Sequence, residues 1–144
     1  MGTNQLYKPY PLPKKRVPTI LPNYIKPLPP RITTDDIEYL DKKGALSIPK
    51  KPLRNALLRA YVEYVHGYMP LLDLHDLLDA VARDDGAGKR ISLLLFQAVM
   101  FAGTAFVDME QLRNAGFATR KDARKAYFLK ARVCHRLKNI RRCL

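Results

Sequence analysis

Residues 91–107 contain no charged side chain, and this uncharged stretch of 17 residues limits what the chain can fold into. A helix that is apolar nearly all round is stable only among other helices or inside a membrane. A membrane-spanning helix needs about 20 predominantly apolar residues. The stretch is short by that measure, and it is interrupted by Ser92, Gln97, Gly103 and Thr104. We therefore predict a buried helix of a helical domain and no membrane partner.

The segments on either side of this stretch have the periodicity of amphipathic helices. Leu53, Leu57 and Tyr61, for example, recur at helical spacing on one face. Helices are expected over residues 35–43, 53–66, 74–83 and from 120 toward the C terminus, with a short helical turn between Asp108 and Gly116. The capping side chains are Thr33 or Thr34, Asp73, and Thr119 with Asp122. No segment alternates with a period of two, so the predicted fold class is all-α.

A helix as apolar as the one expected in residues 91–107 needs several neighbours to cover it. The chain supplies few other helices, and some of them are short. We therefore expect this chain to cover the helix incompletely. The partners predicted from this shortfall are other protein chains or a missing remainder of the domain.

The net charge of +13 is concentrated at the two ends of the chain. Residues 1–31 contribute +6, residues 32–112 contribute −3, and residues 113–144 contribute +10. A uniformly basic nucleic-acid-binding domain would distribute its charge differently. The basic helix from residue 120 nevertheless leaves open a nonspecific nucleic-acid binder as an alternative function.

Eight of the 11 prolines lie within residues 1–30. Proline fixes φ and lacks an N–H group, so we predict a Pro-rich basic leader over residues 1–31 that is extended and has no core of its own. Within the leader, the cluster Lys14, Lys15 and Arg16 is interpreted as a possible nuclear-import signal. The alternative is a solubilising charge in a linker.

The sequence offers little chemistry for catalysis or metal binding. Two cysteines cannot form a disulfide framework or a self-contained zinc module. Only Glu63 lies at helical spacing from His66, which is poor spacing for a metal site, and the acidic residues around His75 are explained by a helix cap. There is no phosphate-binding glycine loop or nucleophile elbow. We therefore expect no enzyme, no catalytic residue, and no metal or cofactor bound by this chain.

Several separated segments resemble the fungal-specific transcription factor domain, in the same order along the chain. In the opening helix, Tyr61, Val65 and His66 match the family pattern, and a turn with Pro70 and Asp73 follows. Residues 92–103 look like the next core helix of the family. Residues 116–126 look like the segment after it, whose matching positions are Gly116 and Arg120. Upstream, residues 21–31 and 43–49 are similar to cutinase transcription factor-type activators.

The resemblance implies a nuclear, non-enzymatic regulatory domain of a zinc-cluster transcription factor. In that family, zinc and DNA are bound by a separate cysteine-rich cluster, which this sequence lacks. DNA is therefore an expected partner only through a cluster absent here. Residues 32–132 match the N-terminal part of the domain, whereas residues 133–144 form a basic tail that departs from the family. We hypothesise that this tail is a truncated or mis-spliced end. A further alternative is a helical protein-interaction or dimerisation module.

Overall fold

The computed structural model describes residues 21–70 and 72–142 of the chain. Its α-helices are α1 (Thr34–Lys42), α2 (Lys51–Ala60), α3 (Leu74–Arg83), α4 (Leu93–Gly103), α5 (Met109–Asn114) and α6 (Arg120–Arg142), and a π-helical segment, η1 (Tyr61–Val65), continues α2. The described part contains no strand; its one isolated bridge pairs Ile25 with Ile91. The predicted all-α fold class is confirmed.

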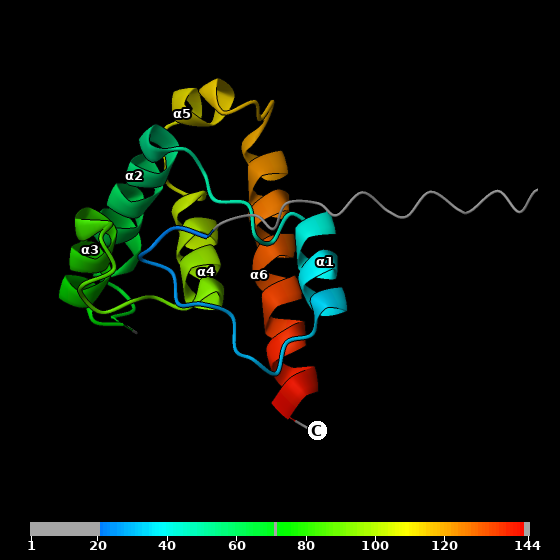
Figure 1. The fold of residues 1–144 in the computed structure, drawn as a ribbon. Coiled ribbons are helices and arrows are strands. Elements are labelled where there is room, and N and C mark those ends of the chain that lie inside the picture. Colours follow the sequence, from blue (N-terminus) through cyan, green and yellow to red (C-terminus); the bar gives the residue numbers. More distant parts are fainter. Residues whose placement is uncertain (1–20, 71, 143–144) are drawn as a thin grey trace, which may run out of the picture.

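Helix α4 lies between α2 and α6 at the centre of the fold (Figure 1). Phe96, Val99 and Met100 of α4 are buried almost completely. The prediction of a buried helix is therefore confirmed, although α4 ends at Gly103 and is shorter than residues 91–107. No helix in the described residues is long and apolar enough to cross a membrane.

The helix ends follow the capping residues in the sequence. Thr33 caps α1 in a reciprocal capping box with Asp36, and Asp73 caps α3. At the start of α6, the Thr119 hydroxyl accepts from the backbone N–H of Asp122 at 3.1 Å. Because these bonds satisfy N–H groups that a helix leaves without partners, local sequence was enough to locate the starts of these three helices.

The helix expected over residues 53–66 is not α-helical throughout. Regular α-geometry ends at Ala60, and the N–H of His66 donates to the carbonyl of Tyr61 at 2.9 Å, five residues back. A π-turn inserts one extra residue and rotates the side chains that follow it. Hydrophobic periodicity does not reveal such an insertion, because the side chains before and after it are both amphipathic.

The segment at residues 21–31 packs against the helices, although its proline content predicted a leader without a core of its own. Tyr24 and Ile25 are buried in the same core as α4. The backbone holds them there, since Ile91 N–H donates to Tyr24 O at 2.8 Å and Lys26 N–H donates to Ile91 O at 2.7 Å. The Tyr24 ring lies 5.7 Å from that of Phe96.

Helix α6 continues through residues 133–142 of the expected basic tail without a break. Val133, Cys134 and Leu137 are buried, as is Tyr127 about two helical turns before Cys134. Burial raises the pKa of Cys134 to about 11 and that of Tyr127 to about 12. These residues therefore belong to the core, although residues 133–144 depart from the family pattern.

The crossing of α4 and α2 at Gly103 generates the first prediction. A Cβ at position 103 would overlap the Leu57 carbonyl oxygen, so we expect Gly103→Ala to lower the free energy of unfolding by about 3 kcal/mol. Urea denaturation measures the change. Gly67→Ala is the matched control, because a Cβ there meets nothing within 4 Å, and it should change stability by less than about 1 kcal/mol. Equal effects of the two substitutions would contradict the close approach.

Candidate interaction surface

The family-pattern residues Tyr61, Val65 and His66 all lie on or next to η1. Tyr61 is buried and desolvation raises its pKa, whereas Val65 and His66 are half-buried. The Tyr61 and His66 rings are 6.3 Å apart, and the buried His66 Nδ1 has no hydrogen-bond partner among the described residues. The π-turn thus sets the direction of the side chains that the sequence pattern singled out.

The remaining family-pattern residues occupy junctions between elements. Pro70 is exposed in the link to α3, and the Asp73 carboxylate accepts the Asp76 N–H at 3.2 Å. Gly116 ends α5 with a φ of +97°, a conformation that glycine adopts without strain. Arg120 Nη1 donates to the carbonyl of Thr104 at 2.8 Å, which ties the start of α6 to the end of α4.

The structure therefore brings two groups of these residues to the C-terminal end of α4. Segment η1 packs on α4, and its Tyr64 ring stacks on Phe106 at 5.2 Å. Arg120 reaches the same end through Thr104. Asp73 and Pro70 belong to the start of α3 instead. Lys14, Lys15 and Arg16 lie outside the described residues.

An aromatic patch is exposed where η1 meets the end of α4. We define it as Tyr64 and Phe106, which are 45% and 51% exposed, with Tyr68 and Met69, which follow η1 and are 89% and 55% exposed. Large apolar side chains gathered on a surface are typical of a protein-interaction site. The sequence contained a signal, the tyrosines at positions 61, 64 and 68, but periodicity placed only Tyr61 on the apolar face and gave the other two no role.

Helix α6 presents a second surface, which is basic. The side chains of Arg120, Lys121, Arg124 and Lys125 surround a shallow hollow of about 520 Å³ with Phe101 and Phe128. The Arg124 guanidinium lies over the Phe101 ring at 5.9 Å, and that ring is 5.6 Å from Phe128. The opposite side of α6 is core, so the packing of α6 confines its exposed cations to the outer face.

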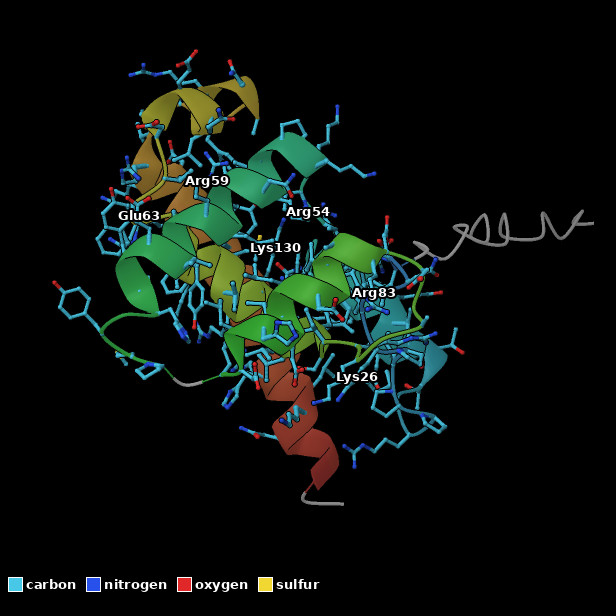
Figure 2. The ribbon with its side chains drawn as sticks, turned by 90° about the vertical axis from the view of Figure 1, so that its left-hand side faces the viewer. Lys26, Arg54, Arg59, Glu63, Arg83 and Lys130 are labelled. Carbon is cyan, nitrogen blue, oxygen red and sulfur yellow. The ribbon has the colours of Figure 1, made fainter. Side chains whose placement is uncertain are left out.

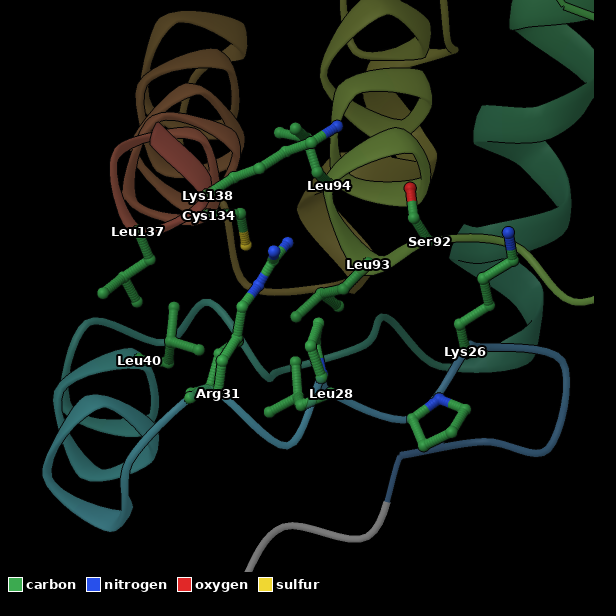
Figure 3. Close-up of a pocket in the computed structure, with 13 residues that line it drawn as sticks. Lys26, Leu28, Arg31, Leu40, Ser92, Leu93, Leu94, Cys134, Leu137 and Lys138 are labelled. Atoms are coloured by element: carbon green, nitrogen blue, oxygen red, sulfur yellow. The ribbon is translucent and has the colours of Figure 1, made fainter. Parts of the chain in front are cut away.

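A smaller hollow of about 190 Å³ lies between the segment at residues 21–31, α1, and the ends of α4 and α6. Its walls are largely apolar, with Leu28, Leu40 and Leu137 among them. Figure 3 shows the Arg31 side chain reaching upward from the N-terminal segment between Leu93 and Cys134. Because Arg31 takes part of the space, the hollow is smaller than a usual ligand pocket of about 300–1,000 Å³.

Ionisable groups in the described residues are dispersed. Desolvation lowers the pKa of Lys130, whose Nζ lies 4.6 Å from the centre of the Tyr127 ring. The hydrogen bond from Lys89 to Asp76, at 2.7 Å, raises the pKa of Lys89. No group of three His, Cys, Asp or Glu side chains in this part of the chain is arranged to hold a metal ion.

Comparison with known proteins identifies relatives of this chain. Over 115 residues the chain is 55% identical to "Cutinase transcription factor 1 beta" of Fusarium vanettenii, a match that covers 80% of this chain and 13% of that protein. The chain is homologous to a segment of fungal transcription factors. It is also 40% identical over 117 residues to a transcription factor of Fusarium pseudograminearum, covering 81% of this chain and 13% of that protein.

A third relative widens the match. Transcription factor cpaR of Aspergillus oryzae is 35% identical over 130 residues, which cover 88% of this chain and 22% of that protein. The chain thus spans between 13% and 22% of the length of these relatives. No family model matches the chain, and no solved structure matches it. The resemblance noted in the sequence is confirmed by these relatives.

The Arg120 contact generates the second prediction. We expect Arg120→Met to lower the free energy of unfolding by about 2 kcal/mol, because it leaves the carbonyl of the buried Thr104 without a charged donor. Urea denaturation followed by circular dichroism measures the loss. Lys121→Met, which removes the same charge from an exposed neighbour, should change stability by less than about 0.5 kcal/mol. If Arg120→Met left the free energy of unfolding unchanged, the contact of Arg120 with Thr104 would not be stabilising the fold.

Proposed function

We propose that the chain is a segment of the regulatory domain of a nuclear fungal transcription factor, with no catalytic activity of its own. The observation that carries the proposal is the 55% identity over 115 residues to cutinase transcription factor 1 beta. That match includes most of the residues that the structure describes. The segment therefore contributes to regulated transcription by the fold that it shares with this relative.

The aromatic patch supports a role in protein contacts. Tyr64 and Phe106 are stacked on each other yet remain half-exposed, and Tyr68 is almost wholly exposed. The relatives extend far beyond the matched segment, since it covers only 13% of the first of them. We propose that the remainder of the regulatory domain packs over this patch.

DNA contact and zinc binding are proposed to lie elsewhere. The family resemblance assigns both to a separate zinc cluster, and two cysteines in this sequence cannot form such a cluster. The proposed role of this segment is thus to regulate a DNA-binding module without itself reading a base sequence.

The third prediction tests this role in a chimera. The matched segment of cutinase transcription factor 1 beta is replaced by this chain in Fusarium vanettenii, and a reporter gene driven by that factor is measured. We expect the chimera to retain transcription, because the folds are shared. The double substitution Tyr64→Ser and Phe106→Ser should lower the reporter signal about fivefold or more, since it removes the patch.

The matched control is Tyr39→Ser, another partly exposed tyrosine, on α1 and outside the patch. It should leave reporter output unchanged. An inactive chimera that accumulates to the same level as the native factor would refute the proposed function. Equal effects of the patch and control variants would refute only the role of the patch.

The fourth prediction concerns location. Fused to two fluorescent proteins, which make it too large to diffuse through the nuclear pore, the chain should accumulate in the nucleus of a fungal cell. Substitution of Lys14, Lys15 and Arg16 by alanine should leave it in the cytoplasm. Substitution of Lys42, Lys43 and Lys50, three exposed cations of the folded part, is the control and should have no effect. Nuclear accumulation of the first variant would contradict the import signal.

A further inference from the structure

A groove runs between α2 and α3, which lie side by side on the face shown in Figure 2. We call it the α2–α3 groove; it encloses about 540 Å³. Its apolar lining consists of Leu58, Val62, Leu78, Val81 and Ala82. Three cations, Lys51, Arg54 and Arg59, line it from α2, and Asp84 is the one acidic residue on its wall. The groove is therefore apolar inside and basic along one edge.

Arg54 is the unusual member of this lining, because its side chain is only 8% exposed. Its Nε and Nη2 donate to the Asn55 side-chain oxygen at 3.2 and 3.1 Å. Its Nη1 lies 3.5 Å from the Tyr24 hydroxyl, and the guanidinium lies over the Tyr24 ring at 5.4 Å. None of these partners carries a negative charge. Within residues 21–70 and 72–142, no carboxylate forms an ion pair with Arg54.

A buried cation without a counter-charge is costly, and buried charges in proteins are usually paired. The position itself does not demand arginine, since Leu53, Leu57 and Leu58 around it fill the core with aliphatic side chains. A methionine or leucine would occupy the same space at lower cost. The neutral contacts to Asn55 and Tyr24 hold the guanidinium in place, and no carboxylate among the described residues forms an ion pair with it.

We propose that the α2–α3 groove binds an acidic, apolar peptide segment of a partner protein. One carboxylate of the peptide pairs with the Arg54 guanidinium, and further acidic side chains meet Lys51 and Arg59 at the edge. An aliphatic side chain of the peptide packs on Val62 and Leu78, which are partly exposed in the groove. The mode is that of an amphipathic segment laid into an apolar groove between two helices.

The lining favours a peptide over a nucleic acid. Sites for single-stranded nucleic acid combine cations with aromatic side chains on which bases stack. The residues that line this groove include no aromatic side chain, and the aliphatic surface between α2 and α3 suits leucine or isoleucine. The inference rests on Arg54 and its surroundings, and it is independent of the proposed transcriptional role.

The fifth prediction tests the groove with peptides selected on the full 144-residue chain. A phage-displayed library of random peptides is enriched on the chain, and the best binders are synthesised with a fluorescein label. We expect selected peptides to be rich in Asp or Glu together with Leu or Ile. In fluorescence anisotropy, Arg54→Met and Leu78→Glu should each weaken binding about tenfold or more.

Arg113→Met is the matched control, because it removes one positive charge from α5, outside the groove, and it should change the Kd less than about twofold. Circular dichroism shows whether each variant is folded. Leu78 is partly exposed, so Leu78→Glu remains informative if Arg54→Met does not fold.

Three outcomes would overturn the proposal. The first is a selection that yields no binder, or binders without carboxylates. The second is binding that persists in both groove variants. The third is that a labelled oligothymidylate binds the chain, and that Arg54→Met abolishes this binding but leaves peptide binding intact. Such a result would assign the groove to nucleic acid.

Discussion

The close packing of α4 against α2 and α6 is the constraint on which the rest of the structure depends. Helix α4 has almost no polar face of its own, so every neighbouring element is placed where it can cover part of this helix. At Gly103 the backbone of α2 comes so close that no side chain fits, and α6 covers the other side through Tyr127, Val133 and Leu137. The N-terminal segment covers the start of α4 through Tyr24.

Polar groups on α4 are used to attach the loops. Gln97 is completely buried, and its Nε2 donates to the carbonyls of Ala45 at 2.8 Å and Ser47 at 3.2 Å. It therefore holds the connection between α1 and α2 against the centre of the fold. At the other end, the Thr104 carbonyl receives Arg120. Gln97 looks like a polar interruption in the sequence, but in the fold its side chain anchors a loop, whereas the hydroxyl groups of Ser92 and Thr104 bond within α4 and its ends.

Helix α4 is covered at its C-terminal end, where Met100, Gly103 and Thr104 are buried, and exposed aromatic side chains lie just past that end. The aromatic patch lies just beyond Gly103, and the relatives have most of their length outside the matched segment.

The positive charges of the described residues occur in two different settings. Helix α6 packs one side on the core and exposes cations on the opposite side. Arg54, in contrast, is a single charged residue that is buried beside an apolar groove. Exposed cations of the first kind contribute solubility and long-range attraction, and a buried cation of the second kind favours a specific acidic contact.

The sequence by itself determined the helical class, the presence of a largely buried helix within residues 91–107, and the starts of α1, α3 and α6. These features depend on periodicity and on capping bonds between residues three positions apart, which are local. Only the tertiary structure decided the π-turn at Tyr61, the docking of Tyr24 and Ile25, and the burial of Arg54 next to Tyr24, 30 residues away. Each of these is fixed by packing between segments far apart along the chain, and local propensity carries no information about such packing.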